Sequence, residues 1–154
     1  MDGGGIWIAF AIFGVPLCVA VVYMLFLRGE TLGEVECSFD GFFGARVDLK
    51  LVVKRAAPSG SKGSPRVGLM YRVPMGAGGR WLSAVEARGL ADAITRAAAP
   101  DVETFRKIRI AGFGVSREAP VGLWMNVGDN DVCCDLSTAE ARELAGLLRE
   151  GAAR

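Results

Sequence analysis

The stretch LSAVEARGLA at residues 82–91 returns, little changed, as LSTAEARELA at residues 136–145. A second pair of stretches, VGLMYRV at 67–73 and VGLWMNV at 121–127, is displaced by the same 54 residues. Two matches in one register are hard to obtain by chance and are typical of an internal repeat. The sequence therefore predicts a duplicated unit, with repeats at about 45–98 and 99–154.

A helix is predicted in each repeat from its capping signal. Ser83 and Ser137 are each followed three residues later by a glutamate, Glu86 and Glu140, which is the S-x-x-E pattern of a capping box. Behind each cap, apolar residues recur at i, i+3, i+4 and i+7 and form the stripe of an amphipathic helix: Ala87, Leu90, Ala91 and Ile94 in the first, Ala141, Leu144, Ala145 and Leu148 in the second.

Strands are predicted where apolar and polar residues alternate. The expected strands are 34–39, 45–54, 66–73, a short one at 81–82, 105–113, 121–127 and 132–134, with a hairpin turn at 128–131. The predicted fold of residues 29–154 is therefore a compact α+β domain of duplicated β-β-(β)-α units, an antiparallel sheet with two helices on one face.

The N-terminal segment is predicted to be a single transmembrane helix. Residues 6–27 are apolar, and no charge lies between Asp2 and Arg28. At 1.5 Å per residue, such a helix is about 33 Å long, against a hydrocarbon core of about 30 Å. The residues expected to span the membrane include Ile6, Trp7, Gly14, Pro16, Cys18, Tyr23 and Leu27.

Two alternatives to this anchor are a cleaved signal peptide and a buried core helix. A signal peptide is not indicated, because the segment lacks a basic N-terminal region and a small-residue cleavage site. A buried core helix is not indicated either, because a helix over residues 6–27 would have no polar face. Because Lys and Arg follow the segment and none precedes it, the positive-inside rule places the domain in the cytoplasm of a single-pass membrane protein.

Composition excludes several classes of function. The chain has 154 residues, 51% hydrophobic and 23% charged, with a formal net charge of +1 and a mean hydropathy of +0.33. These values rule out a disordered chain and a strongly basic nucleic-acid-binding protein. There is no histidine, which excludes Ser-His-Asp and Cys-His catalysis and His-ligated metal sites.

Cysteine usage leaves one question open. Cys18 lies in the apolar segment, and the domain contains Cys37 and the adjacent pair Cys133 and Cys134. No C-x-x-C pair is present, so neither a zinc site nor a thioredoxin-like motif is indicated. The three domain cysteines are interpreted as small apolar strand residues. In an oxidising space Cys37 could instead pair with Cys133 or with Cys134.

No catalytic, cofactor or metal site is predicted. The glycine-rich PMGAGGR at 74–80 does not match a phosphate-binding loop and is interpreted as a turn. The oxygens of Asp129, Asn130, Asp131 and Asp135 lack the spacing of a calcium loop.

Basic residues give the remaining candidate contacts, with lipid headgroups or a partner: Lys54, Arg55, Lys62, Arg66, Arg106, Lys107 and Arg109. We therefore expect a noncatalytic, membrane-anchored protein whose domain contacts a partner protein or a second copy of itself at the membrane surface, without nucleic acid. The alternative is a membrane-tethered module that senses or binds a small ligand.

Overall fold

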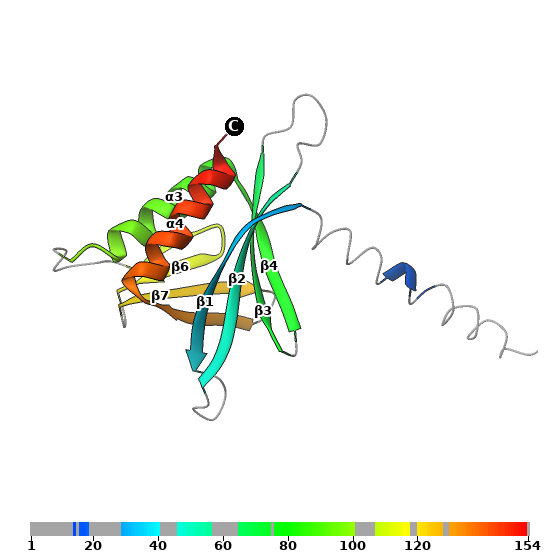
Figure 1. The fold of residues 1–154 in the computed structure, drawn as a ribbon, viewed down its shortest axis with the longest axis horizontal. Helices are drawn as coiled ribbons and strands as arrows, with labels where there is room; N and C mark the ends of the chain where they lie inside the picture. The colour runs from blue at the N-terminus through cyan, green and yellow to red at the C-terminus, as the bar shows by residue number, and fades with distance from the viewer. Residues whose placement is uncertain are drawn as a thin grey trace, which may run out of the picture.

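Four strands precede each of two helices in the structure. The computed structural model of the chain describes residues 14, 16–18, 29–40, 46–56, 65–74, 76–100, 107–117, 120–127 and 130–153. The elements, in chain order, are β1 (Glu30–Asp40), β2 (Arg46–Ala56), β3 (Arg66–Val73), β4 (Gly76–Ser83), α3 (Ala84–Ala97), β5 (Ile108–Ile110), β6 (Phe113–Ser116), β7 (Val121–Val127), β8 (Asn130–Leu136) and α4 (Thr138–Ala152) (Figure 1).

The eight strands form one antiparallel sheet in the order β4-β3-β2-β1-β8-β7-β6-β5. Strands β1 and β2 are paired over ten residues, whereas the register between β1 and β8 contains one pair, Ser38 with Asp135. We call β1–β4 and β5–β8 the two half-sheets, and the junction of β1 with β8 the seam. The strands of the two half-sheets run in clearly different directions (Figure 1).

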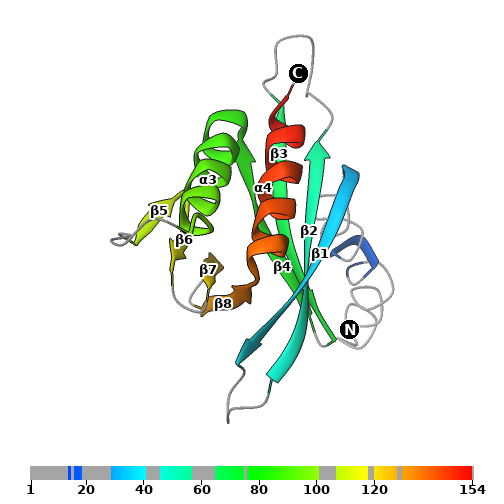
Figure 2. The same cartoon turned by 60° about the vertical axis from the view of Figure 1, so that its left-hand side comes forward.

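Both helices lie on the same side of the sheet and run antiparallel to each other (Figure 2). Helix α4 packs on β1, β2 and β3, which belong to the first half-sheet, and helix α3 packs on β4, β5 and β6. Each helix thus covers strands that lie in the other half of the chain. The two halves are interlocked around one core.

The core confirms the predicted buried faces of β2 and β3, although Val52 and Lys54 on the opposite face of β2 are buried as well. The alternating residues Leu49, Leu51 and Val53 of β2 are fully buried, as are Val67 and Leu69 of β3. The two predicted helix stripes are fully buried as well: Ala87, Leu90, Ala91 and Ile94, and Ala141, Leu144, Ala145 and Leu148. Alanine at half of these positions lets the helix backbones approach the sheet and each other closely.

The capping boxes are also confirmed. Ser83 and Ser137 are the N-caps of α3 and α4, and each accepts a hydrogen bond from the backbone N–H of the glutamate three residues later. That glutamate, Glu86 or Glu140, accepts a bond from the backbone N–H of the serine in return. The local signal in the sequence was sufficient because the whole motif lies within four residues.

Three strand predictions need correction. The glycine-rich run at 74–80, expected to be a turn, and the short strand expected at 81–82 belong mostly to one strand, β4, which pairs with β3 from Gly76 to Ser83. The expected single strand at 105–113 is a hairpin of β5 and β6, because Ala111 and Gly112, with φ of 49° and 83°, form a tight two-residue turn. The expected turn at 128–131 is shorter, because Asn130 and Asp131 already pair with β7. The predicted second repeat therefore contains four strands, β5–β8, and the first, at about 45–98, contains three, β2–β4, with β1 before it.

The predicted transmembrane helix, and with it the single-pass, cytoplasm-facing arrangement, is not supported. Within the residues that the structure describes, no helix is long and apolar enough to cross a membrane. Of the residues proposed to span it, Gly14, Pro16 and Cys18 are described, and Pro16–Cys18 make one helical turn. Ile6, Trp7, Tyr23 and Leu27 lie outside the described residues. Hydropathy shows that a segment avoids water, but not that it forms one long helix.

Candidate binding groove

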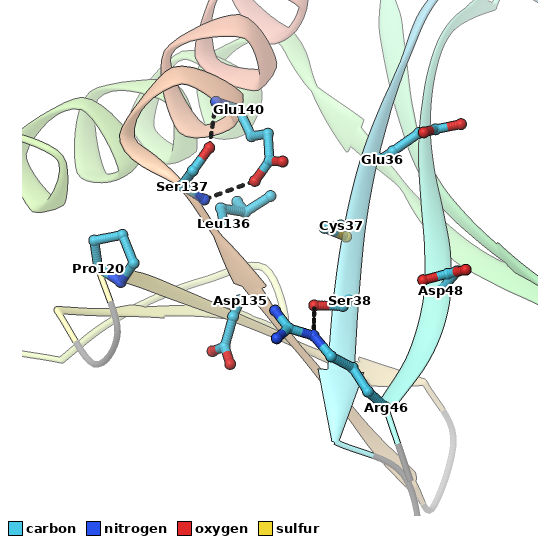
Figure 3. A pocket seen from close by; sticks show the side chains of 10 residues that line it. All are labelled: Glu36, Cys37, Ser38, Arg46, Asp48, Pro120, Asp135, Leu136, Ser137 and Glu140. Atoms are coloured by element: carbon cyan, nitrogen blue, oxygen red, sulfur yellow. Dashed lines mark hydrogen bonds between the residues drawn. The ribbon is translucent and has the colours of Figure 1, made fainter.

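A groove with a volume of about 460 Å³ lies at the seam between the half-sheets. One wall comes from β1 and the start of β2, and the other from the end of β8 and the first turn of α4 (Figure 3). We call it the seam groove. Its lining residues are Glu36, Cys37, Ser38, Arg46, Asp48, Pro120, Asp135, Leu136, Ser137 and Glu140.

The groove exists because β1 and β8 separate directly beyond their single residue pair. Strand β8 ends at Leu136, whose side chain is fully buried, and the chain turns at Ser137 into α4. On its other edge, β1 stays paired with β2 all the way back to Glu30. In the described residues, the edge of β1 from Glu30 to Cys37 has no strand partner on the β8 side.

Carboxylates outnumber cations in the seam groove. Glu36 lies 2.7 Å from Nζ of Lys50, and the hydrogen bond and charge of Lys50 lower the pKa of Glu36. Glu140 is held by the backbone N–H of Ser137 at 2.7 Å. In the part of the chain that the structure describes, Asp48 and Asp135 take part in no ion pair. These two carboxylates are the negative charges left to attract a ligand.

Arg46 is the cation that lines the groove. Its Nε donates a hydrogen bond of 2.8 Å to Oγ of Ser38, the residue that pairs with Asp135 across the seam (Figure 3). The guanidinium has further N–H donors, which can bind a carbonyl oxygen. The groove therefore offers both acceptors and donors on facing walls.

Among the residues that the structure describes, no group of three or more Asp, Glu, Cys or His could hold a metal ion. The thiol lining the groove belongs to Cys37, which is buried. The arrangement is suited to binding through hydrogen bonds and negative charge.

The basic residues predicted to contact lipid or a partner lie in different surroundings, as far as the structure describes them. Lys54 is buried, with 7% of its surface exposed, and Arg55 donates from Nη2 to the carbonyl oxygen of Glu150 at 2.6 Å. Arg66 is exposed at the start of β3. Lys62 and Arg106 lie outside the described residues.

Lys107 and Arg109 are the two that the structure brings together. Nζ of Lys107 lies 5.1 Å, and Cζ of Arg109 5.9 Å, from the centre of the Trp124 ring, which is cation–π distance. The ring lies over Gly114, where a Cβ atom would overlap the indole. These two cations therefore serve the packing of Trp124 on the second half-sheet.

Sequence analysis missed most of the groove. Its lining comes from segments around residues 36–38, 46–48, 120 and 135–140, far apart in the chain. The sequence groups Asp135 only with the acidic run near the turn at 128–131. Only the pairing of β1 with β8 brings these segments together, and no local pattern indicates it.

Comparison with protein-family models, with curated proteins and with solved structures finds no match for this chain. The structure shows an interlocked α+β protein with a polar groove at the seam of its sheet.

Proposed function

We propose that this domain is a noncatalytic interaction module that binds an extended, basic segment of a partner protein in the seam groove. The observation that supports this most is the open edge of β1 beside the carboxylates of Asp48 and Asp135. The lack of histidine in the chain and the lack of any catalytic constellation in the groove favour binding over catalysis.

An extended peptide suits this site because a strand edge offers a row of N–H and C=O groups. Peptides that add a strand to such an edge gain main-chain hydrogen bonds, and side-chain pockets supply the specificity. Glu34 and Glu36 alternate on the exposed side of β1. They would favour Lys or Arg at alternate positions of the added strand, since opposite charges on neighbouring strands attract.

The test is a binding titration with fluorescently labelled peptides. The probe is an eight-residue peptide that alternates Lys with Val, and its matched control alternates Glu with Val. We expect the Lys peptide to bind, with its Kd raised about three- to tenfold by Asp48→Asn or Asp135→Asn and by added salt. Glu143→Gln, at an exposed acid of α4 outside the groove, should leave the Kd unchanged.

Equal binding of both peptides would contradict the proposal, as would a Kd unaffected by the two Asp→Asn variants. Amide shifts in the NMR spectrum provide a second readout. They should follow β1 from Glu30 to Cys37 if a strand is added there.

A second candidate is a small-ligand site, the class expected as the alternative. The groove volume lies within the range of about 300–1,000 Å³ common for ligand pockets. Ser38, Arg46 and Ser137 converge on it with hydrogen-bonding groups. A small ligand would shift the amide signals of these groove residues and leave unchanged those of the part of β1 outside the groove, Glu30–Val35.

A further inference from the structure

A second, smaller pocket lies where α3 ends and α4 begins. Its volume is about 150 Å³, and its described lining includes Arg117, Thr138 and Arg142 together with residues 97–100 at the end of α3. We call it the arginine pocket. It adjoins the seam groove, because Pro120 lines both.

The arginine pocket is positively charged, in contrast to the seam groove. Its described lining contains two arginines and no aspartate or glutamate. The C-terminal end of α3 and the N-terminal end of α4 also meet there, but their partial charges have opposite signs and roughly cancel. The charge that remains is that of the two guanidinium groups, and an anion with two negative charges would balance it.

The internal repeat separates Arg142 from a purely structural arginine. Its counterpart 54 residues earlier, Arg88, donates from Nη2 to the carbonyl oxygen of Ala152 at 2.9 Å and so binds the last residue of α4. By the same offset, the counterpart of Ala152 is Ala98 at the end of α3. Within the described residues, Arg142 makes no hydrogen bond to Ala98 and no ion pair. It lines the arginine pocket instead.

Arg117 and Thr138 add donors beside Arg142. Nη2 of Arg117 donates to the carbonyl oxygen of Pro100 at 2.9 Å, which ties the residue after β6 to the segment after α3. A guanidinium group has five N–H donors, so this bond is compatible with a bond to a ligand oxygen. Thr138 lies four residues before Arg142 on α4, and residues at this spacing are neighbours on one helix face.

We propose that the arginine pocket binds a phosphate group. A phosphate group carries a charge of about −2 near neutral pH, and its oxygens can accept hydrogen bonds from both guanidinium groups and from the Thr138 hydroxyl. The pocket has the volume of about five water molecules, which is room for one phosphate group. The phosphate is either a free ion or part of a phosphorylated residue in the segment bound by the adjoining seam groove. Only the second source rests on the proposed function.

The first test is an NMR titration of the full chain with sodium phosphate at pH 7.5 and constant ionic strength. We expect saturable shifts of the Arg117 and Thr138 amide signals in the millimolar range. Arg142→Gln should raise the Kd about tenfold, because it removes a charged donor. Arg66→Gln removes the same charge at an exposed position that lines neither pocket, and should leave the Kd unchanged. Melting temperatures of both variants check that they fold.

The second test identifies the source of the phosphate. Its probes are the Lys–Val peptide extended at either end by phosphoserine, and the same peptides with serine. For a phosphorylated segment, one phosphopeptide should bind about tenfold more tightly than its serine control. Arg142→Gln should remove that gain, whereas Asp135→Asn should weaken both peptides alike. Equal binding of the phosphoserine and serine peptides, with saturable binding of inorganic phosphate, would assign the pocket to the free ion.

The two proposals fail in different ways. If inorganic phosphate binds at Thr138 but none of the peptides binds, the phosphate site stands and the proposed function is contradicted. The inference is overturned if neither inorganic phosphate nor a phosphopeptide gives saturable shifts at Arg117 and Thr138. It is also overturned if Arg142→Gln and the wild-type protein bind phosphate with the same Kd.

Discussion

Ser83 and Glu86 hold the first turn of α3 through three hydrogen bonds. The Glu86 carboxylate accepts from the backbone N–H and from the hydroxyl of Ser83, each at 2.8 Å, and the Ser83 hydroxyl accepts from the Glu86 N–H at 3.3 Å. Ser83→Ala removes two of these bonds. We expect it to lower the free energy of unfolding by about 1 kcal/mol, measured by urea denaturation.

The same box makes stability depend on pH. The hydrogen bonds from Ser83 lower the pKa of Glu86 below its ordinary value of 4.5. Ionised Glu86 therefore stabilises the folded chain above about pH 4.5, and this contribution is lost as the pH falls through the folded-state pKa. Glu86→Gln should cost stability at pH 7 and little near pH 3, as followed by thermal melts. A penalty independent of pH would count against a role for the charge.

Ala111 occupies an unfavourable backbone conformation. Its φ of 49° lies in the left-handed region, which non-glycine residues rarely adopt and Asn tolerates best. Arg80 donates from Nη1 to the Ala111 carbonyl at 3.0 Å, and this bond does not depend on the side chain at 111. Ala111→Asn should raise the free energy of unfolding by about 0.5–1 kcal/mol in urea denaturation.

Gly112→Ala is the contrasting variant of that turn. At φ of 83°, an added Cβ would meet the Arg80 guanidinium, so this change should destabilise the protein. If both variants moved stability in the same direction, the account of the turn would be wrong.

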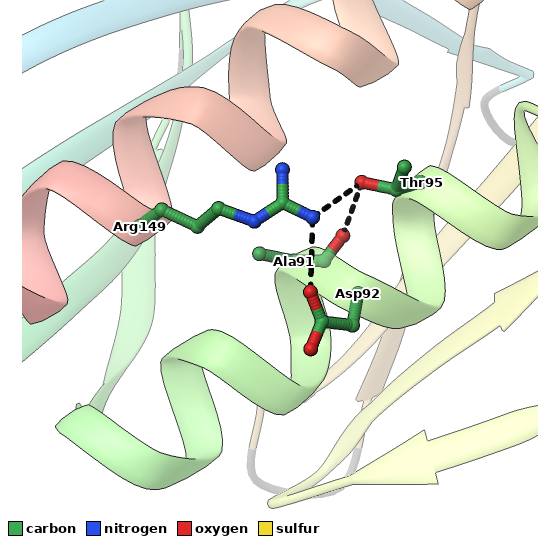
Figure 4. A network of polar contacts seen from close by, with 4 residues as sticks. All are labelled: Ala91, Asp92, Thr95 and Arg149. Carbon is green, nitrogen blue, oxygen red and sulfur yellow. Dashed lines mark hydrogen bonds and ion pairs between the residues drawn. The ribbon is translucent and has the colours of Figure 1, made fainter.

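At the scale of elements, packing holds α3 and α4 together more than their surface charges do. Arg149 of α4 donates to Asp92 and to the Thr95 hydroxyl of α3, each at 2.9 Å, and Thr95 bonds the Ala91 carbonyl at 2.7 Å (Figure 4). The Arg149 and Asp92 side chains are 46% and 57% exposed, so water screens the pair.

Two substitutions one turn apart on α4 test this difference. Arg149→Ala should change the free energy of unfolding by less than about 1 kcal/mol. Ala145→Leu, at a fully buried position, should cost about 1–3 kcal/mol, because the extra atoms force the helix away from its neighbours. Chemical denaturation measures the free energy of unfolding of both variants. A larger loss of stability for Arg149→Ala than for Ala145→Leu would contradict the view that packing holds the two helices together.

At the scale of the whole molecule, the halves depend on each other. Gly33 of β1 lies against Leu147 of α4, and Gly151 of α4 lies against Val67 of β3 and Leu32 of β1. Gly89 of α3 lies close to Ile110 of β5. Without the other half, each helix would leave apolar surface exposed, and small units rarely stay folded in that state.

We therefore predict that a chain cut between Pro100 and Lys107 gives two fragments that are unfolded alone and fold when mixed. Circular dichroism of each fragment and of the mixture measures this, with the uncut chain as the reference. A cooperative thermal transition in either fragment by itself would show that one half can fold alone.

The element pattern of the second half shows where prediction from sequence reached its limit. Leu136 and Ser137 marked a helix start correctly, because the cap and the apolar residue before it are neighbours in the chain. The alternation in residues 105–113 predicted one strand where the structure has the hairpin of β5 and β6. The turn was not recognised, because Ala111 and Gly112 lack the usual Asn-Gly signal. The groove could not be predicted, since Asp48 and Asp135 come together only through the order of the strands.

The amino-acid sequence by itself determined the α+β character of the domain, the starts of both helices and the buried faces of the strands around Leu49–Val53 and Val67–Leu69. These features depend on neighbours within one turn or on a fixed periodicity. Tertiary structure alone decided that β1 meets β8, that each helix covers strands of the other half, and that Cys37 and Cys134 are buried whereas Cys133 is exposed. The reason is physical: such contacts join residues distant in the chain, and their energy depends on how complete surfaces fit together.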